Sequence, residues 1–125
     1  MSKVYIFRTG NPKQIYLHLK TVAPRIDKDT VLIKPNIVIA AKPNSAVVTD
    51  FKLVKAIIKY LKEIGVKRII IGESPGLNVD VELAFKVSGF SRLAQEENIE
   101  LLNLEKAETL EKTWKFGKIK IPKIL

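Results

Sequence analysis

The chain has 125 residues, 46% of them hydrophobic, and this length and composition predict a single domain, residues 1–125, with its own core. It has no cysteine, which excludes disulfides, thiolate metal sites, iron–sulfur ligation by this chain and a cysteine nucleophile. The sequence has no run of about 18 uncharged apolar residues and no apolar signal-peptide core, so we expect a cytoplasmic protein that does not enter a membrane.

The formal charge of +9 is unevenly distributed. Residues 1–72 carry 14 Lys/Arg and 4 Asp/Glu, residues 73–111 carry 3 and 9, and residues 112–125 carry 5 and none. No nucleic-acid-binding motif and no grouping of the cations with aromatic residues is recognised, so a nucleic-acid partner is the least favoured hypothesis. Abundant Lys, Glu and Ile without Cys is typical of a thermophile's surface.

The N-terminal part of the chain predicts a strand, a helix and a second strand. Residues 4–8 are mostly β-branched or aromatic and alternate, as in a strand. Asn11 followed by proline predicts a helix over residues 12–22. His18, the only histidine, is predicted to be a partly exposed surface residue of this helix, because it lacks the partners that catalysis or metal binding needs. Residues 31–35 form the second predicted strand.

Residues 37–48 follow this strand and fit no regular element. A loop of this length in a small domain is usually a binding loop, a lid or a segment packed on a partner. Its apolar residues fit equally well with a loop that simply covers the edge of the sheet. The sequence leaves these alternatives open.

The central helix and strand carry the strongest signals in the chain. Thr49 and Asp50 are capping residues, and the apolar residues that follow have helical spacing until Gly65 ends the helix. The lysines on its opposite side are typical of a solvated helix face. Residues 67–72 predict the most apolar strand, which is typical of a buried position in a parallel sheet.

The C-terminal part predicts two short helices, a strand and a terminal arm. Asp80 caps the first helix, residues 91–98 form the second, and residues 99–104 form the strand. Residues 112–125 alternate around a glycine and predict a hairpin or an extended arm. Together these elements predict an α/β fold, a three-layer sandwich with a mainly parallel central sheet built from residues 4–8, 31–35, 67–72 and 99–104.

Polar residues follow two of the predicted parallel strands. Because the carboxyl ends of parallel strands meet at one edge of a sheet, these residues should meet in one cleft, as a candidate ligand-binding site. Its residues are Lys34, Asn36, Thr49, Asp50, Glu73, Ser74 and Gly76.

Each of these residues also has a purely structural explanation. Lys34 could hold a phosphate or carboxylate and Glu73 could act as a general base, or the two could form a salt bridge between strand ends. Asp50 could bind a ligand or only cap its helix. The Gly-Glu-Ser-Pro-Gly turn matches neither dinucleotide-binding nor Walker patterns, and no serine-nucleophile motif occurs, so no catalytic residue, cofactor or metal is assigned.

Three motifs occur in a fixed order: KPN at a strand end, TD at a helix start and GESPG at the next strand end. They are followed by the segment VELAFKVSGFSRLAQEENIELLNLE. With this order and spacing, the chain resembles the DUF362 family over residues 31–125. The resemblance implies an α/β fold that corresponds to the N-terminal half of longer relatives, some of which carry a ferredoxin-like iron–sulfur domain. That iron–sulfur role does not transfer to a chain without cysteine.

Two functional hypotheses follow. In the first, the domain binds a phosphorylated or carboxylated small molecule at the carboxyl ends of its strands, and whether it is an enzyme stays open. In the second, it is a non-catalytic interaction module that docks onto itself or onto a partner chain that supplies the second half. We therefore also predict a homo-oligomer, most simply a two-fold dimer, or a complex with a partner chain.

Overall fold

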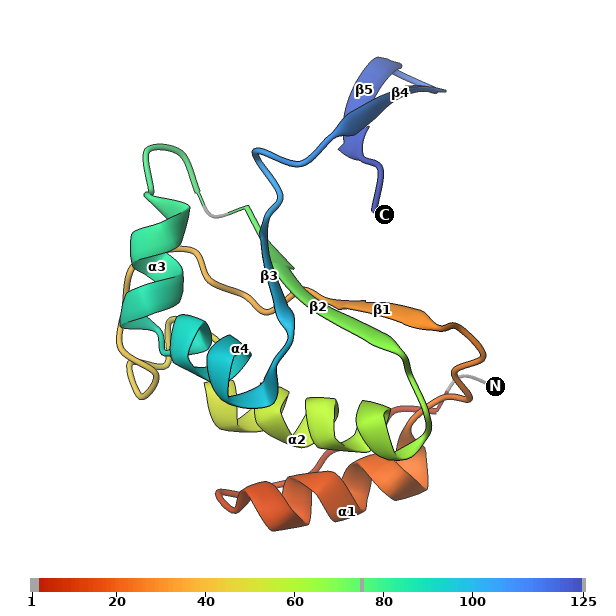
Figure 1. Cartoon of the computed structure of the whole chain (residues 1–125), viewed down its shortest axis with the longest axis vertical. Helices are drawn as coiled ribbons and strands as arrows, with labels where there is room; N and C mark the ends of the chain where they lie inside the picture. The colour runs from red at the N-terminus through yellow and green to blue at the C-terminus, as the bar shows by residue number, and fades with distance from the viewer. Residues whose placement is uncertain (1–2, 75, 125) are drawn as a thin grey trace.

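The computed structural model describes residues 3–74 and 76–124 and shows a mixed α/β fold (Figure 1). The predicted strands at residues 31–35, 67–72 and 99–104 are confirmed as the three strands of one sheet. In chain order the elements are α1 (Pro12–Val22), β1 (Thr30–Ile33), α2 (Phe51–Glu63), β2 (Arg68–Glu73), α3 (Val81–Val87), α4 (Phe90–Glu97), β3 (Glu100–Asn103), β4 (Thr109–Trp114) and β5 (Gly117–Pro122).

The three strands β1, β2 and β3 are parallel, with β2 in the centre. Leu32 of β1 lies opposite Ile70 of β2, and Gly72 of β2 lies opposite Leu102 of β3. Helix α2 connects β1 to β2, and helices α3 and α4 connect β2 to β3. The chain therefore contains the two βαβ units that the alternation of strand and helix signals predicts.

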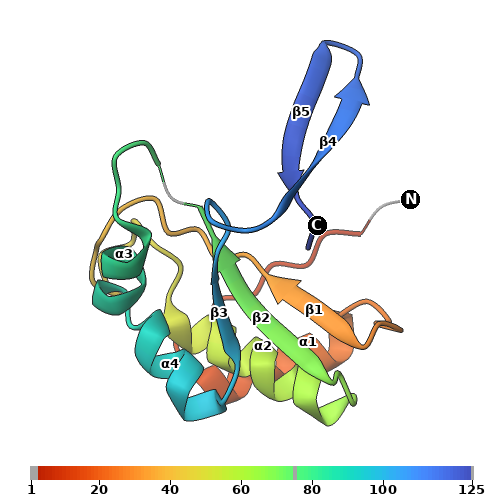
Figure 2. The ribbon, with the colours of Figure 1, turned by 45° about the horizontal axis from the view of Figure 1, so that its top comes forward.

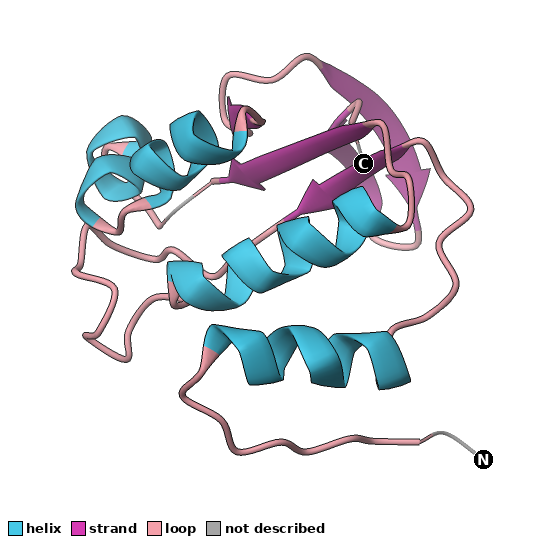
Figure 3. Ribbon diagram, turned by 60° about the horizontal axis from the view of Figure 1, so that its bottom comes forward, coloured by secondary structure: helices cyan, strands magenta, loops and turns pink. Residues whose placement is uncertain are grey.

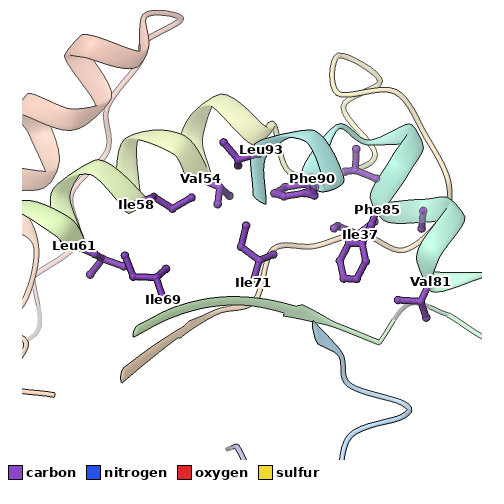
Figure 4. Close-up of a cluster of buried hydrophobic side chains, with 12 residues drawn as sticks. Ile37, Val54, Ile58, Leu61, Ile69, Ile71, Val81, Phe85, Phe90 and Leu93 are labelled. Carbon is purple, nitrogen blue, oxygen red and sulfur yellow. The ribbon is translucent and has the colours of Figure 1, made fainter. Parts of the chain in front are cut away.

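The hydrophobic core lies between one face of this sheet and helices α2, α3 and α4 (Figure 4). Ile69 and Ile71, two residues apart on β2, point to this face because side chains alternate along a strand. The apolar stripe of α2 packs against them, and α3 and α4 bring two phenylalanines that are almost fully buried. The buried members are Ile37, Val48, Val54, Ile58, Leu61, Ile69, Ile71, Val81, Ala84, Phe85, Phe90 and Leu93.

Helix α1 packs on the outer side of α2, away from the sheet (Figure 3). The Asn11 side chain caps it by accepting a hydrogen bond from the backbone N–H of Lys13, as the sequence predicts. None of the residues of α1 is buried. The ammonium of Lys20 lies 2.6 Å from the carboxylate of Glu63 on α2. Surface contacts of this kind hold α1 in place with little core burial.

The predicted strand over residues 4–8 is wrong. This segment is extended but belongs to no strand, and Val4 and Ile6 are 85% and 91% exposed. The ring of Phe7 instead stacks on that of His18 in α1, with 4.1 Å between centroids and 11° between planes. The segment therefore follows the outer side of α1 and does not reach the edge of the sheet (Figure 3).

The prediction of a three-layer sandwich is not confirmed. In the described part of the chain, helices α2, α3 and α4 share one core with a single face of the sheet, and α1 lies beyond α2 on the same side (Figures 1 and 4). All crossovers run in the same direction along the strand order, so right-handed connections place their helices on one side.

The other face of the sheet, called the second sheet face here, carries Leu32, Ile70, Gly72 and Leu102. Ile70 is fully buried, whereas the two leucines are half-buried. A Cβ atom on Gly72 would lie 2.9 Å from Cδ1 of Leu32, so this side chain crosses directly over the glycine. The carboxyl-terminal half of this face is therefore apolar and closely packed. Its amino-terminal end is polar, because Thr30 and the ion pair of Arg68 with Glu100 lie on the same face.

Strands β4 and β5 form an antiparallel hairpin that projects from the body of the domain (Figure 2). The register pairs Trp114 with Gly117, and Lys115 and Phe116 form the turn between the strands. This confirms the predicted hairpin in the C-terminal arm. The hairpin is exposed along its length except at its base, where Leu110, Ile121 and Pro122 are half-buried.

Candidate functional site at the carboxyl ends of the strands

Glu73, the last residue of β2, is the centre of the candidate site. It is only 3% exposed. Its Oε1 atom accepts hydrogen bonds from Nζ of Lys34 and from the backbone N–H of Ser74, at 2.8 Å for the latter. Its Oε2 atom accepts from the backbone N–H of Ile37 at 3.3 Å. A buried carboxylate needs such donors, and here both oxygens have them.

Lys34 directly follows β1 and forms a salt bridge with Glu73, the partner on the neighbouring strand end. The structural alternative that the sequence leaves open for this pair is therefore present. The Lys34 side chain is 52% exposed, whereas that of Glu73 is 4% exposed. An ammonium group has three donors, so the solvent side of Lys34 can still meet a second anion.

Asn36 and Thr49 close the two ends of the loop between β1 and α2. The Thr49 hydroxyl accepts from the backbone N–H of Asn36 at 2.9 Å, and the Thr49 N–H donates to the carbonyl of Asn36 at 2.8 Å. The side-chain amide of Asn36 donates to the carbonyl of Val47 at 3.3 Å. In this structure both residues serve to hold the loop together.

The other three candidates lie around the same edge. Asp50 caps α2 by accepting from the N–H of Lys52 at 2.8 Å, which is the structural role the sequence predicts for it. Ser74 is exposed and uses its N–H on Glu73. Gly76 is exposed, and its carbonyl accepts from Val79 at 3.2 Å. Pro75, in the same turn, lies outside the described residues.

The loop over residues 37–48 divides its apolar side chains between the core and the surface. Ile37 and Val48 are buried in the core, at 1% and 6% exposure. Val38, Ile39 and Val47 are between 42% and 45% exposed. The loop therefore covers the edge of the sheet and also presents an apolar surface next to the candidate site.

Two cavities lie beside α1 and α2. The first, of about 380 Å³, is lined mainly by apolar residues of the N-terminal segment, α1 and the start of α2, with Asp50 and Lys52 at its border. The second, of about 510 Å³, lies between α1 and α2 near Tyr16. Neither is lined by Lys34, Glu73 or Ser74.

The described residues contain no group of three or more His, Cys, Asp or Glu side chains that could hold a metal ion. Among them, no helix combines the length and the apolar content that spanning a membrane requires. Away from the site, a hydrogen bond from Arg92 and a further one from Lys55 lower the pKa of Glu96.

Sequence reasoning missed one cluster. In the hairpin, Trp114 and Phe116 lie beside several lysines, a grouping that the sequence analysis did not recognise. The signal was the alternation of lysine with apolar residues over residues 112–120. It becomes a cluster only when the turn at Lys115 brings both strands together.

Comparison with family models gives one match: a model described as "Domain of unknown function (DUF362)" matches residues 31–125. Comparison with curated proteins and with solved structures gives no match. The matched region begins within β1 and includes the sheet, helices α2 to α4 and the hairpin, but not α1.

Proposed function

Because the chain belongs to the DUF362 family, a domain of unknown function, we propose a function from its surfaces: it is an interaction module whose second sheet face docks onto another copy of the chain. The main observation behind the proposal is that helices cover only one face of the parallel sheet in the described residues. Helices α2, α3 and α4 lie on one side, and no helix of the described residues lies against the second sheet face (Figure 1).

Parallel sheets occur almost only with both faces covered, and their strands are then apolar on both faces. Strand β2 has this composition, since Ile69, Ile70 and Ile71 are consecutive and all buried. A second copy docked on the second sheet face would cover that face, as the apolar composition of β2 predicts.

The test is the mass of the protein in solution. Light scattering coupled to size exclusion should show a dimer, and Leu32→Lys should shift it to the monomer because it places a charge on the docking face. Leu77→Lys is the matched control: Leu77 is 96% exposed and does not lie on the sheet, so this variant should stay dimeric. Circular dichroism checks that each variant is folded. A parent protein that is monomeric at high concentration would overturn the proposal.

A second candidate function is the binding of a small phosphorylated or carboxylated molecule at the strand ends. It is favoured by one observation: the buried Glu73 holds the half-exposed ammonium of Lys34 in a fixed position beside Ser74. The solvent side of this ammonium, with the Ser74 hydroxyl, could receive an anion, with Asn36, Thr49, Asp50 and Gly76 shaping the surroundings.

Thermal unfolding with inorganic phosphate and with acetate tests this second function. Stabilisation of the parent by either anion, lost in Lys34→Ala, would support the site, because a ligand that binds only the folded state stabilises it. Lys67→Ala is the control, since Lys67 forms an exposed pair with Asp29 at the far end of β2. If the anions stabilise the parent and both variants equally, binding is not at Lys34.

A further inference from the structure

The tip of the β4–β5 hairpin gathers aromatic rings on a projecting arm (Figure 2). Trp114, the only tryptophan of the chain, is 52% exposed, and Phe116 is 75% exposed. Their ring centroids are 5.0 Å apart, and the ring planes meet at 76°. Each ring supports the other by an edge-to-face contact while their outer surfaces face solvent.

The same hairpin is basic. It contains four lysines and one glutamate, so its formal charge is +3. The register places Lys112 on the same face as Trp114, whereas Lys118 and Lys120 lie on the opposite face. The ammonium of Lys115, in the turn, lies 5.5 Å from the ring centroid of Phe116. Lysines therefore lie on both faces of the tip, although the ammonium of Lys118 is 2.7 Å from the carboxylate of Glu111 on its own face.

The geometry points to a single-stranded nucleic acid as the ligand of this tip. Proteins that bind single strands without sequence preference combine aromatic side chains, on which bases stack, with cations that follow the phosphates. Trp114 and Phe116 offer the stacking surfaces, and the lysines around them offer the cations. The inference does not rest on docking through the second sheet face, which is a different surface.

An unpaired strand fits these observations better than a duplex or an acidic peptide. The bases of a duplex are already stacked on one another, whereas unstacked bases can lie on exposed aromatic side chains. An acidic peptide would use the lysines but would leave two large, exposed rings without a role. The whole chain adds long-range attraction for a polyanion, since its formal charge is +9.

Trp114 supplies the measurement, because any change in tryptophan fluorescence reports on the tip alone. Titration with an oligothymidylate of about 12 nucleotides should quench this fluorescence, as a base stacks on the indole. Contacts to three phosphates predict a slope of about −2 in a plot of log affinity against log salt concentration. Fluorescence anisotropy of a labelled oligonucleotide gives an independent affinity for the parent and for each variant.

Phe116→Ala should weaken binding by about 5- to 150-fold, the range for loss of one stacked base. It should not affect the fold, because the ring is exposed. Lys112→Ala should reduce the magnitude of the salt slope by about 0.7. Lys13→Ala removes a lysine at the start of α1, outside the hairpin, and is the matched control for charge, with an unchanged slope expected.

Three results would overturn the inference. The first is equal affinity in Phe116→Ala and the parent. The second is equal quenching by poly-glutamate of the same length, which would favour an acidic peptide. The third is a tryptophan signal that depends on protein concentration but not on the oligonucleotide, which would make the tip a docking site for protein.

Discussion

Removing the charge of Glu73 should destabilise the fold more than removing its partner Lys34. In Glu73→Gln, one carboxamide oxygen replaces two carboxylate oxygens that together accept from Lys34, Ser74 and Ile37. The new NH₂ group is itself a donor and faces donors, so about two hydrogen bonds are lost in a buried site. At about 1–1.5 kcal/mol each, the expected loss in the free energy of unfolding is about 2–3 kcal/mol.

Lys34→Ala should cost less, because it leaves the two backbone N–H donors to Glu73 in place. Breaking a fully buried pair costs about 3–5 kcal/mol, but the Lys34 side chain is 52% exposed, so water can reach the carboxylate once it is gone. Because solvent screens the exposed side of the pair, the expected loss in the free energy of unfolding is smaller, about 1–2 kcal/mol.

Urea unfolding of both single variants and of the double variant measures these values and the coupling between the residues. Glu100→Gln is the matched control, because Glu100 forms an exposed pair with Arg68 across β2 and β3. This substitution should lower the free energy of unfolding by less than about 1 kcal/mol. The reasoning would be refuted if Glu73→Gln behaved like this control, or if Lys34→Ala were the more damaging change.

Three further changes test individual elements. Gly89→Ala should destabilise by about 1–2 kcal/mol in urea unfolding, because Gly89 has φ 86° and a Cβ atom there would strain the left-handed backbone. Asp50→Ala should cost about 1 kcal/mol, measured in the same way, because it removes the cap of α2. NMR titration should give Glu96 a pKa below that of glutamate in the unfolded chain, because Arg92 donates a hydrogen bond to its carboxylate. Because its pKa is lower in the folded state, Glu96 contributes to the free energy of unfolding at pH values above its unfolded-state pKa. This contribution is lost as the pH falls through the folded-state pKa, so Glu96→Gln should destabilise the protein less in acid than at neutral pH.

The sheet and its helices could be predicted from the sequence because several local signals agree there. Strand β2 combines β-branched residues with a glycine-ended helix before it, and Asp50 is a strong capping residue at the start of that helix. The meeting of Lys34 and Glu73 was also predictable, because it follows from the rule that parallel strands end at one edge.

The features that the sequence did not predict share one cause: each depends on contacts that the local sequence pattern does not specify. Residues 4–8 have the composition of a strand, but strand formation needs a partner, and stacking of Phe7 on His18 holds the segment elsewhere. The hydrogen bond from Ile37 to Glu73 depends on the path of an aperiodic loop, for which the sequence carries no spacing signal. Likewise, the aromatic and basic tip of the hairpin depends on a turn that brings two strands into register.

The shallow burial of α1 implies that the chain does not open as a single unit. Since no residue of α1 is buried and its packing is on α2, it can detach while the sheet and the core around Phe85 and Phe90 stay closed. Amide hydrogen exchange should therefore be fast in α1, through local unfolding, and slow in β2, where exchange requires global unfolding. The slow-exchanging segment would then lie within the family-matched residues 31–125, and α1 outside them.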